Sequence, residues 1–193
     1  MSTAIIVARG GSTRIPRKNI IKFMGRPMLS YAIGTARDSG LFDRILVSTE
    51  DTEIMCIAGA YGATTLARPA ELATNEVGTQ SVMQHAVTSL AIPDMDPVCC
   101  IYPCVPMLTP DDLRQAHKNL LLHSYIVAVA PEPLRDIGWF YFGRAISFAS
   151  GLPLYSSTTG LHVIEESRAI DINVPEDLAT AERMYTALAK HAA

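Results

Sequence analysis

The chain has 193 residues, of which 49% are hydrophobic and 18% are charged, and its formal net charge is −3. This balance is typical of a folded protein with a sizeable core and excludes a disordered chain. The slightly acidic net charge argues against general nucleic-acid binding. No apolar run reaches the length of a membrane span, and no signal-peptide pattern precedes the first predicted strand. We expect one domain over residues 1–193, in the cytoplasm, with no nucleic-acid or membrane partner.

The first distinctive feature is a basic loop that contains two glycines. Residues 4–8 are apolar and stop close to Gly10 and Gly11, which predicts a buried strand followed by a turn. Glycines let the backbone approach an anion, and the side chains around them are Arg9, Ser12, Arg14, Arg17 and Lys18. The pattern favours an anion-binding loop over a solvated basic turn. Its spacing matches neither G-x-x-x-x-G-K-[ST] nor G-x-G-x-x-G, which argues against a Walker A loop and a dinucleotide fingerprint.

Predicted strands and helices alternate along the rest of the chain. The helix-like segments are 27–39, 50–61, 79–90, 110–122, 143–149 and 175–190, and the strand-like segments are 43–49, 62–66, 98–102, 125–130, 136–142 and 161–165. Residues 98–102 form a continuous apolar run, as expected for a central strand that is buried on both faces. This alternation predicts a three-layer α/β/α fold with a mostly parallel, doubly wound sheet. Ligands then bind at the carboxyl ends of the strands.

Polar residues at three predicted helix starts have a capping interpretation. The sequence Thr109-Pro110-Asp111-Asp112 combines an N-cap, a proline at the first helical position and an acid two residues later. In Ser48-Thr49-Glu50-Asp51 we favour helix capping over catalysis. Thr79 ends a polar loop that is a candidate for ligand contacts, and its hydroxyl could cap the next helix or meet a ligand.

The four cysteines and five histidines show no metal-site spacing. Cys56, Cys99, Cys100 and Cys104 are interpreted as small buried hydrophobes without disulfides. Neighbouring Cys99 and Cys100 should point to opposite faces of a sheet. The aromatic segment 136–142 is either ordinary core packing or the wall of a pocket.

Taken together, these motifs resemble a known family. Residues 8–19 read A-R-G-G-S-T-R-I-P-R-K-N, similar to the signature A-R-G-G-S-K-R-I-P-R-K-N of the acylneuraminate cytidylyltransferases, the CMP-sialate and CMP-pseudaminate synthetases. Further similar segments follow in family order: 47–51 (V-S-T-E-D), 68–72 (R-P-A-E-L), 102–106 (Y-P-C-V-P), 136–143 and 171–177 (D-I-N-V-P-E-D). The R-I-P-R-K-N form, the Tyr-Pro pair and the F-Y-F-G stretch are most similar to the pseudaminate branch.

The resemblance implies a nucleotide-diphospho-sugar transferase-like domain, as a homodimer, that joins CTP to a small acidic sugar and releases pyrophosphate. It implies that Arg9 and Lys18 are catalytic and offset charge on the triphosphate. The implied nucleotide-binding residues are Arg9, Gly10, Gly11, Ser12, Arg14, Lys18, Asn19, Arg68 and Thr79. The implied cofactor is Mg²⁺, held by Asp171 and Asn173.

The chain departs from the family pattern at several positions. Thr13 replaces a lysine of the loop, and Trp139 replaces a polar residue. Asn173 stands where the family has a second acid, so it is either a weaker metal ligand or the N-cap of a capping box with Glu176. A long family insertion is reduced to residues 130–135, which implies a shortened acceptor-binding and dimerisation region over residues 130–165.

Three functions from different classes follow. The first is a cytidylyltransferase acting on pseudaminate or a related nonulosonic acid. The second is a degenerate paralogue that binds nucleotide or a partner without turnover, favoured by Thr13, Asn173 and the short acceptor region. The third is a nucleotidyltransferase with another small acceptor. The cluster of Arg9 and Lys18 favours an enzyme.

Overall fold

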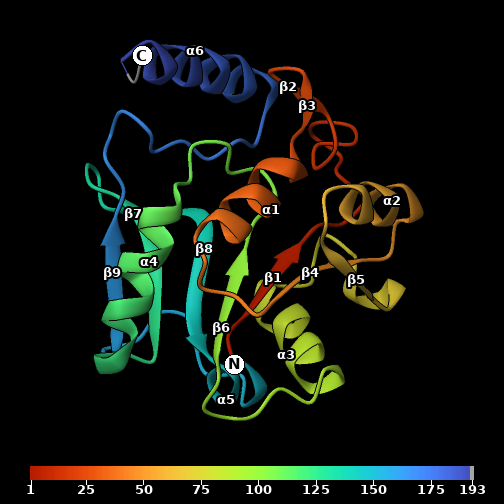
Figure 1. Ribbon diagram of the computed structural model, residues 1–193, viewed down its shortest axis with the longest axis vertical. Helices are drawn as coiled ribbons and strands as arrows, with labels where there is room; N and C mark the ends of the chain where they lie inside the picture. The colour runs from red at the N-terminus through yellow and green to blue at the C-terminus, as the bar shows by residue number, and fades with distance from the viewer. Residues whose placement is uncertain (192–193) are drawn as a thin grey trace.

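A computed structural model describes residues 1–191 and is built around one seven-stranded sheet (Figure 1). Its strands are β1 (Thr3–Val7), β4 (Arg44–Thr49), β5 (Thr64–Ala67), β6 (Pro97–Ile101), β7 (Tyr125–Ala130), β8 (Arg135–Arg144) and β9 (Thr159–Val163), with a separate hairpin of β2 (Lys22–Phe23) and β3 (Arg26–Pro27). The α-helices are α1 (Leu29–Asp38), α2 (Thr52–Ala60), α3 (Thr79–Ser89), α4 (Pro110–Asn119), α5 (Ala145–Ala149) and α6 (Pro175–His191), and short 3₁₀ turns η1 (Ala70–Leu72) and η2 (Leu120–Leu122) complete the list. Within residues 1–191, no helix is long and apolar enough to cross a membrane.

The sheet has the order β5-β4-β1-β6-β8-β7-β9. β1 pairs parallel with β4 and β6, β4 pairs parallel with β5, and β7 pairs parallel with β9. β8 alone runs antiparallel to its neighbours β6 and β7. Residues 131–134 join β7 to β8 directly, and so short a connection can link only antiparallel neighbours. The predicted three-layer fold with a mostly parallel, doubly wound sheet is confirmed.

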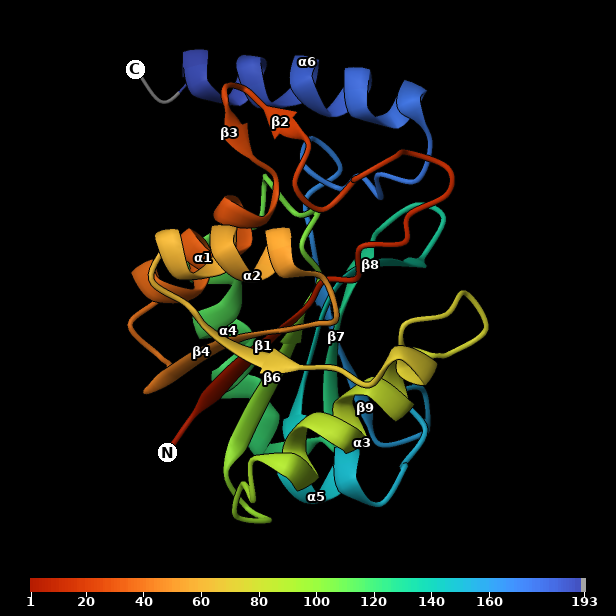
Figure 2. The same cartoon turned by 90° about the vertical axis from the view of Figure 1, so that its right-hand side faces the viewer.

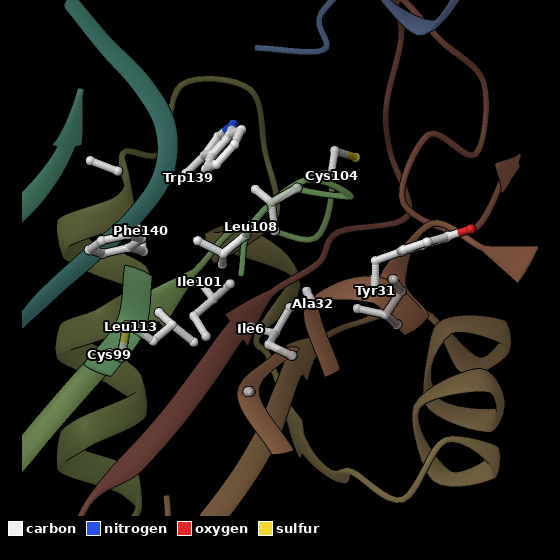
Figure 3. Close-up of a cluster of buried hydrophobic side chains, with 14 of the residues drawn as sticks. Ile6, Tyr31, Ala32, Cys99, Ile101, Cys104, Leu108, Leu113, Trp139 and Phe140 are labelled. Carbon is white, nitrogen blue, oxygen red and sulfur yellow. The ribbon is translucent and has the colours of Figure 1, made fainter. Parts of the chain in front are cut away.

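Alternate side chains of the central strands pack into two cores. Ile6 faces a core that includes α1, α2, α4 and α6, part of which is shown in Figure 3, whereas Ile5 faces the core formed with α3 and α5. Cys99 and Cys100 divide between the same two cores, as predicted from the pleat of a strand. The prediction that Cys56 is buried is wrong: this side chain is exposed on the outer face of α2.

The predicted helix caps form at α4 and α2. The Thr109 hydroxyl accepts from the Asp112 N–H at 3.2 Å, and the Asp112 carboxylate accepts from the Thr109 N–H at 2.9 Å, which is a capping box. Asp51 caps α2 by accepting from the Ile54 N–H at 3.0 Å. These side chains satisfy N–H groups that a helix start leaves without intrahelical partners.

Both interpretations of the aromatic segment are confirmed, for different residues. Trp139, Phe140 and Phe142 are buried with at most 1% of their surface exposed, so they are core residues. Asp136 and Gly138, on the same strand, line the cavity described below. The segment therefore joins the core to the wall of a site.

The strand order creates a crevice beside β1. The chain proceeds from β1 to β4 on one side and later reaches β6 on the other, so the loops that leave the carboxyl ends of β1 and β6 diverge. Helix α6 lies across this end of the molecule, above the β2–β3 hairpin (Figure 2). The rings of Tyr185 on α6 and Phe23 on β2 meet edge to face at 5.5 Å.

Candidate active site

A cavity of about 670 Å³ opens at the carboxyl ends of the central strands. Its walls come from the loops after β1, β5 and β6 and from the segment before α6. The cavity brings together most of the predicted site residues: Arg9, Ser12, Arg14, Lys18, Asn19, Arg68, Thr79, Asp171 and Asn173. Gly10 and Gly11 belong to the same loop but do not line the cavity.

Three cations of the basic loop are held by uncharged partners. Arg9 donates to the Thr74 carbonyl at 2.6 Å and to Oδ1 of Asn75 at 2.7 Å. Lys18 Nζ donates to the Ile172 carbonyl at 2.6 Å, and Arg14 donates to Oδ1 of Asn173 at 3.0 Å. Across residues 1–191, these three side chains form no ion pair with a carboxylate. Their uncompensated positive charge suits the cavity to an anionic ligand.

Arg17 differs from the other loop cations and does not enter the cavity. Its guanidinium pairs with Asp51 and, at 2.6 Å, with Glu53, both in the first turn of α2. The hydrogen bond from Arg17 lowers the pKa of the Asp51 carboxyl from 3.8 to about 2. Arg17 has a φ of 56°, in the left-handed region, which turns the chain back toward α2. This pair anchors the loop to the scaffold.

Gly10 is required by a close approach between the loop and α2. A Cβ at this position would lie 2.3 Å from Oδ2 of Asp51, closer than real Cβ contacts allow. The Gly10 N–H donates to Oε1 of Glu50 at 2.6 Å, so this amide is engaged by a side chain and does not face the cavity. Asn19, which is buried, donates to the Arg9 carbonyl at 2.7 Å and closes the loop upon itself.

Arg68 places a buried positive charge at the base of the cavity. Only 7% of its surface is exposed, and it donates to the Ser48 carbonyl at 2.6 Å and to the Ser48 hydroxyl at 3.2 Å. Burial lowers the pKa of this guanidinium, and the charge of Glu50 offsets part of this effect. No carboxylate of residues 1–191 lies within ion-pair distance of Arg68. Burying a cation without a close ion-pair partner is costly, and an anionic ligand in the cavity would compensate it further.

The Thr79 hydroxyl does not cap α3, and its predicted contact with a ligand stays a prediction for a residue that lines the cavity. Gly78, one residue earlier, is the N-cap of α3, and it forms no side-chain cap. The Thr79 hydroxyl is hydrogen-bonded to the hydroxyl of Tyr102, whose pKa is raised to about 12, chiefly by burial. Val77 and Thr79 both line the cavity, so the amino-terminal end of α3 is directed toward it. The helix dipole then adds to the positive potential.

Asp171 and Asn173 hydrogen-bond to each other at the cavity wall. Asn173 Nδ2 donates to Oδ2 of Asp171 at 2.5 Å, while the Asn173 oxygen accepts from Arg14. The predicted capping box of Asn173 with Glu176 is wrong. The carboxylate of Asp177 instead accepts from the N–H groups of Asn173 and Val174, at 2.8 and 2.9 Å.

The cavity offers few ligands for a divalent cation. No cluster of three or more His, Cys, Asp or Glu side chains able to hold a metal occurs within residues 1–191. Mg²⁺ at nucleotide sites takes one or two carboxylates and completes its shell with water and substrate phosphates. Asp171 meets that requirement, and loss of solvent around it raises its pKa. The oxygen of Asn173 is already engaged by Arg14, so Asp171 is the fitting protein ligand.

Sequence reasoning did not assign Asp136 to the site. It lines the cavity from the start of β8. Its carboxylate accepts from the Gly138 N–H at 2.7 Å and from the Tyr141 hydroxyl. Burial, followed by this hydrogen bond, raises the pKa of Tyr141. The sequence signal for this site residue is an acid placed directly before the apolar residues 137–142.

Comparisons with known proteins agree with this geometry. A family model described as cytidylyltransferase matches residues 3–174. Pseudaminic acid cytidylyltransferase of Campylobacter jejuni is 31% identical over 219 residues, covering 94% of this chain and 94% of that one. A solved structure of CMP:2-keto-3-deoxy-manno-octonic acid synthetase complexed with CTP has a TM-score of 0.76 at 14% identity, covering 97% and 99% of the two chains. Rv0371c from Mycobacterium tuberculosis, solved with manganese, has a TM-score of 0.67 at 10% identity, covering 94% and 98%.

At such low identities the two solved structures establish similarity of fold alone. The family model and the relative at 31% identity show that the chain, with its three-layer fold and basic cavity, is a nucleotidyltransferase. The family match over residues 3–174 then shows that the chain belongs to the cytidylyltransferase family.

The Arg17–Asp51 pair predicts a pH-dependent stability. Because the pKa of Asp51 is lower in the folded state than its usual 3.8, the stabilisation is complete above about pH 4 and is lost as the pH falls toward 2. We expect Arg17→Gln to lower the free energy of unfolding by about 1 kcal/mol at pH 6, since the arginine is partly exposed, and the deficit to shrink between pH 4 and pH 2.

Urea denaturation of both proteins at a series of pH values measures this difference. Arg37→Gln is the control, because Arg37 pairs only with exposed Asp38 on α1 and should change stability little. A deficit for Arg17→Gln that stays constant from pH 6 to pH 2 would contradict the role given to the pair.

Proposed function

We propose that this protein transfers CMP from CTP to the anomeric hydroxyl of a nonulosonic acid of the pseudaminate type and releases pyrophosphate. The observation that carries the proposal is one cavity, in a cytidylyltransferase-family chain, that gathers four cations without carboxylate partners beside Asp171. The name of the Campylobacter jejuni relative supports the choice of acceptor.

The reaction needs positioning and charge neutralisation more than covalent chemistry. The anomeric oxygen bonds to the α-phosphorus, and the bond from that phosphorus to the bridging oxygen of the β-phosphate breaks. Pyrophosphate leaves, and the hydroxyl proton passes to solvent. Arg9 and Lys18 would hold the triphosphate and offset charge on the departing group, while Ser12 and Arg14 complete the cradle. Arg68 and Thr79 would lie nearest the cytidine.

A divalent cation fits the same arrangement. Bound Mg²⁺ would supply charge neutralisation to the triphosphate. Asp171 is the residue proposed to hold it, and Asn173 orients the Asp171 carboxylate through its amide. Gly10 and Gly11 act in this proposal by shaping the loop, because the Gly10 amide is engaged by Glu50.

Residues 130–165 are proposed as the acceptor side. Asp136 and Gly138, both in this region, face the cavity, and the turn at 131–134 leaves that side open without an inserted segment. The family and the named relatives favour turnover over the alternative of nucleotide binding alone, and Thr13 lines the same cavity as Arg9, Lys18 and Asp171.

We also propose a homodimer in the cytoplasm, where CTP is available. Leu121 and Leu122 are 77% and 87% exposed, and β9, with exposed Leu161 and Val163, is an open edge of the sheet. Such a surface is usually covered in an assembly. Sedimentation equilibrium should give the mass of two chains, and a mass of one chain at micromolar concentration would contradict the dimer.

The proposed activity predicts pyrophosphate release that requires CTP, Mg²⁺ and a nonulosonic acid together. We expect the highest kcat/KM with pseudaminate among a panel that includes N-acetylneuraminate and 3-deoxy-manno-octulosonate. Arg9→Ala should lower kcat by about 100-fold or more, the loss typical for a charge-stabilising donor. Arg37→Ala, an exposed arginine on α1, is the matched control and should be unchanged. If the protein binds CTP but releases no pyrophosphate with any acceptor, the transferase proposal is contradicted.

Asn173→Asp should lower the Mg²⁺ concentration needed for half-maximal activity. The substitution places a second carboxylate beside Asp171, where the two now share a hydrogen bond, and a divalent cation relieves the resulting repulsion. Titration of Mg²⁺ in the pyrophosphate assay measures the shift. Asn119→Asp, the same change at the exposed end of α4, controls for added charge. An unchanged or higher Mg²⁺ requirement for Asn173→Asp would show that this position is remote from the cation.

A further inference from the structure

The segment that carries Asp171 lies between β9 and α6 and has no regular secondary structure. A segment of this kind has no ladder or helical hydrogen bonds to fix it, so its geometry depends on other contacts. One such contact is the indole of Trp139, the only tryptophan of the chain, which donates from Nε1 to the Ile170 carbonyl at 2.8 Å.

The Trp139 ring packs in the core, whereas its N–H binds the backbone of the Asp171 segment. The ring is 1% exposed and packs in the core, while its nitrogen is turned away from Leu108 and Ile101 in the close-up view (Figure 3). A buried indole N–H requires an acceptor, and here the acceptor is a backbone carbonyl one residue before Asp171. The core therefore determines where that carbonyl lies.

Arg168 is a second anchor of the same segment. It binds the carboxylate of Asp112 with two hydrogen bonds, at 2.7 and 3.1 Å, and donates to the Met107 carbonyl at 3.2 Å. The side chain of Asp112 is 7% exposed and is further bound by Thr109 and His162. A buried two-point pair of this kind is rigid as well as strong. It ties the segment to the start of α4.

These anchors bear on Asp171, which is proposed to hold the metal, and on Lys18, which is proposed to hold the triphosphate. The Ile170 carbonyl is held by Trp139, and the Ile172 carbonyl accepts from Lys18 at 2.6 Å, so the two fixed carbonyls flank Asp171. Ile172 itself is 1% exposed, which prevents the segment from rotating. We infer that Trp139 and Arg168 are positioning residues that hold the Asp171 carboxylate and the Lys18 ammonium in one geometry for a metal–triphosphate complex. This inference rests on the proposed function.

Binding of Mn²⁺ in the presence of CTP, without an acceptor, tests the inference apart from turnover. The electron paramagnetic resonance signal of free Mn²⁺, compared with the same titration of CTP without protein, gives the affinity of the protein for the Mn²⁺–CTP complex. Trp139→Phe keeps an aromatic ring in the core but removes the N–H, and Arg168→Lys keeps the charge but removes the two-point geometry. We expect each variant to weaken Mn²⁺ binding about fivefold, the effect of losing one hydrogen bond.

Tyr125→Phe is the control, because it also removes one donor from a buried aromatic ring. Its hydroxyl donates to the Leu152 carbonyl at 3.2 Å, in a loop that is separate from the Asp171 segment. This variant should bind Mn²⁺ within twofold of the wild-type chain. Thermal unfolding of all four proteins reports the effect on stability separately, and if Trp139→Phe does not fold, Arg168→Lys decides.

The outcomes separate this inference from the proposed function. Unchanged Mn²⁺ affinity in the variants, even with a lower melting temperature, overturns the positioning role and leaves the proposed function standing. Absence of CTP-dependent Mn²⁺ binding in the wild-type chain overturns both. Weaker Mn²⁺ binding in Trp139→Phe and Arg168→Lys, with an unaffected Tyr125→Phe, supports the inference.

Discussion

The site depends on positive charge that forms no ion pair with a carboxylate within residues 1–191. Arg9, Arg14 and Lys18 are held by carbonyl and amide oxygens, and Arg68 is buried against Ser48. Neutral acceptors orient these cations but do not cancel their charge. The cavity therefore keeps the positive electrostatic potential that a polyphosphate requires. The amino-terminal end of α3 borders the cavity and adds to this potential.

The same loop uses one cation and one glycine for its own support. Arg17 is neutralised by two acids of α2, and Gly10 permits the Asp51 carboxylate to lie against the backbone. Glu50 then binds the Gly10 amide. Along the basic loop, residues that anchor it therefore alternate with residues that face the cavity. Cations of similar sequence context have opposite roles because only some of them meet carboxylates in three dimensions.

Much of the fold could be predicted because its signals are local. Apolar runs such as residues 98–102, the alternation of elements and the capping residues Thr109 and Asp112 all act within a few residues of one another. The exposure of Cys56 could not be predicted in the same way, since its short apolar helix buries only Ile54 and Ala58. The sequence leaves Asn173 as either an N-cap of α6 or a metal ligand. In the structure Arg14 and Asp171 engage its amide, and the Asp177 carboxylate accepts from the N–H groups before α6.

The sequence by itself determined the alternation of the main strands and helices, the basic loop, nine of the 22 residues that line the cavity and the resemblance to cytidylyltransferases. These features depend on residue type and spacing, which the chain carries locally. Only the tertiary structure decided that Arg17 faces α2, that Asp136 enters the cavity and that Trp139 and Arg168 anchor the segment of Asp171. Each of these contacts joins residues far apart in the chain, and their partners are selected by the geometry of the packed sheet rather than by neighbouring sequence.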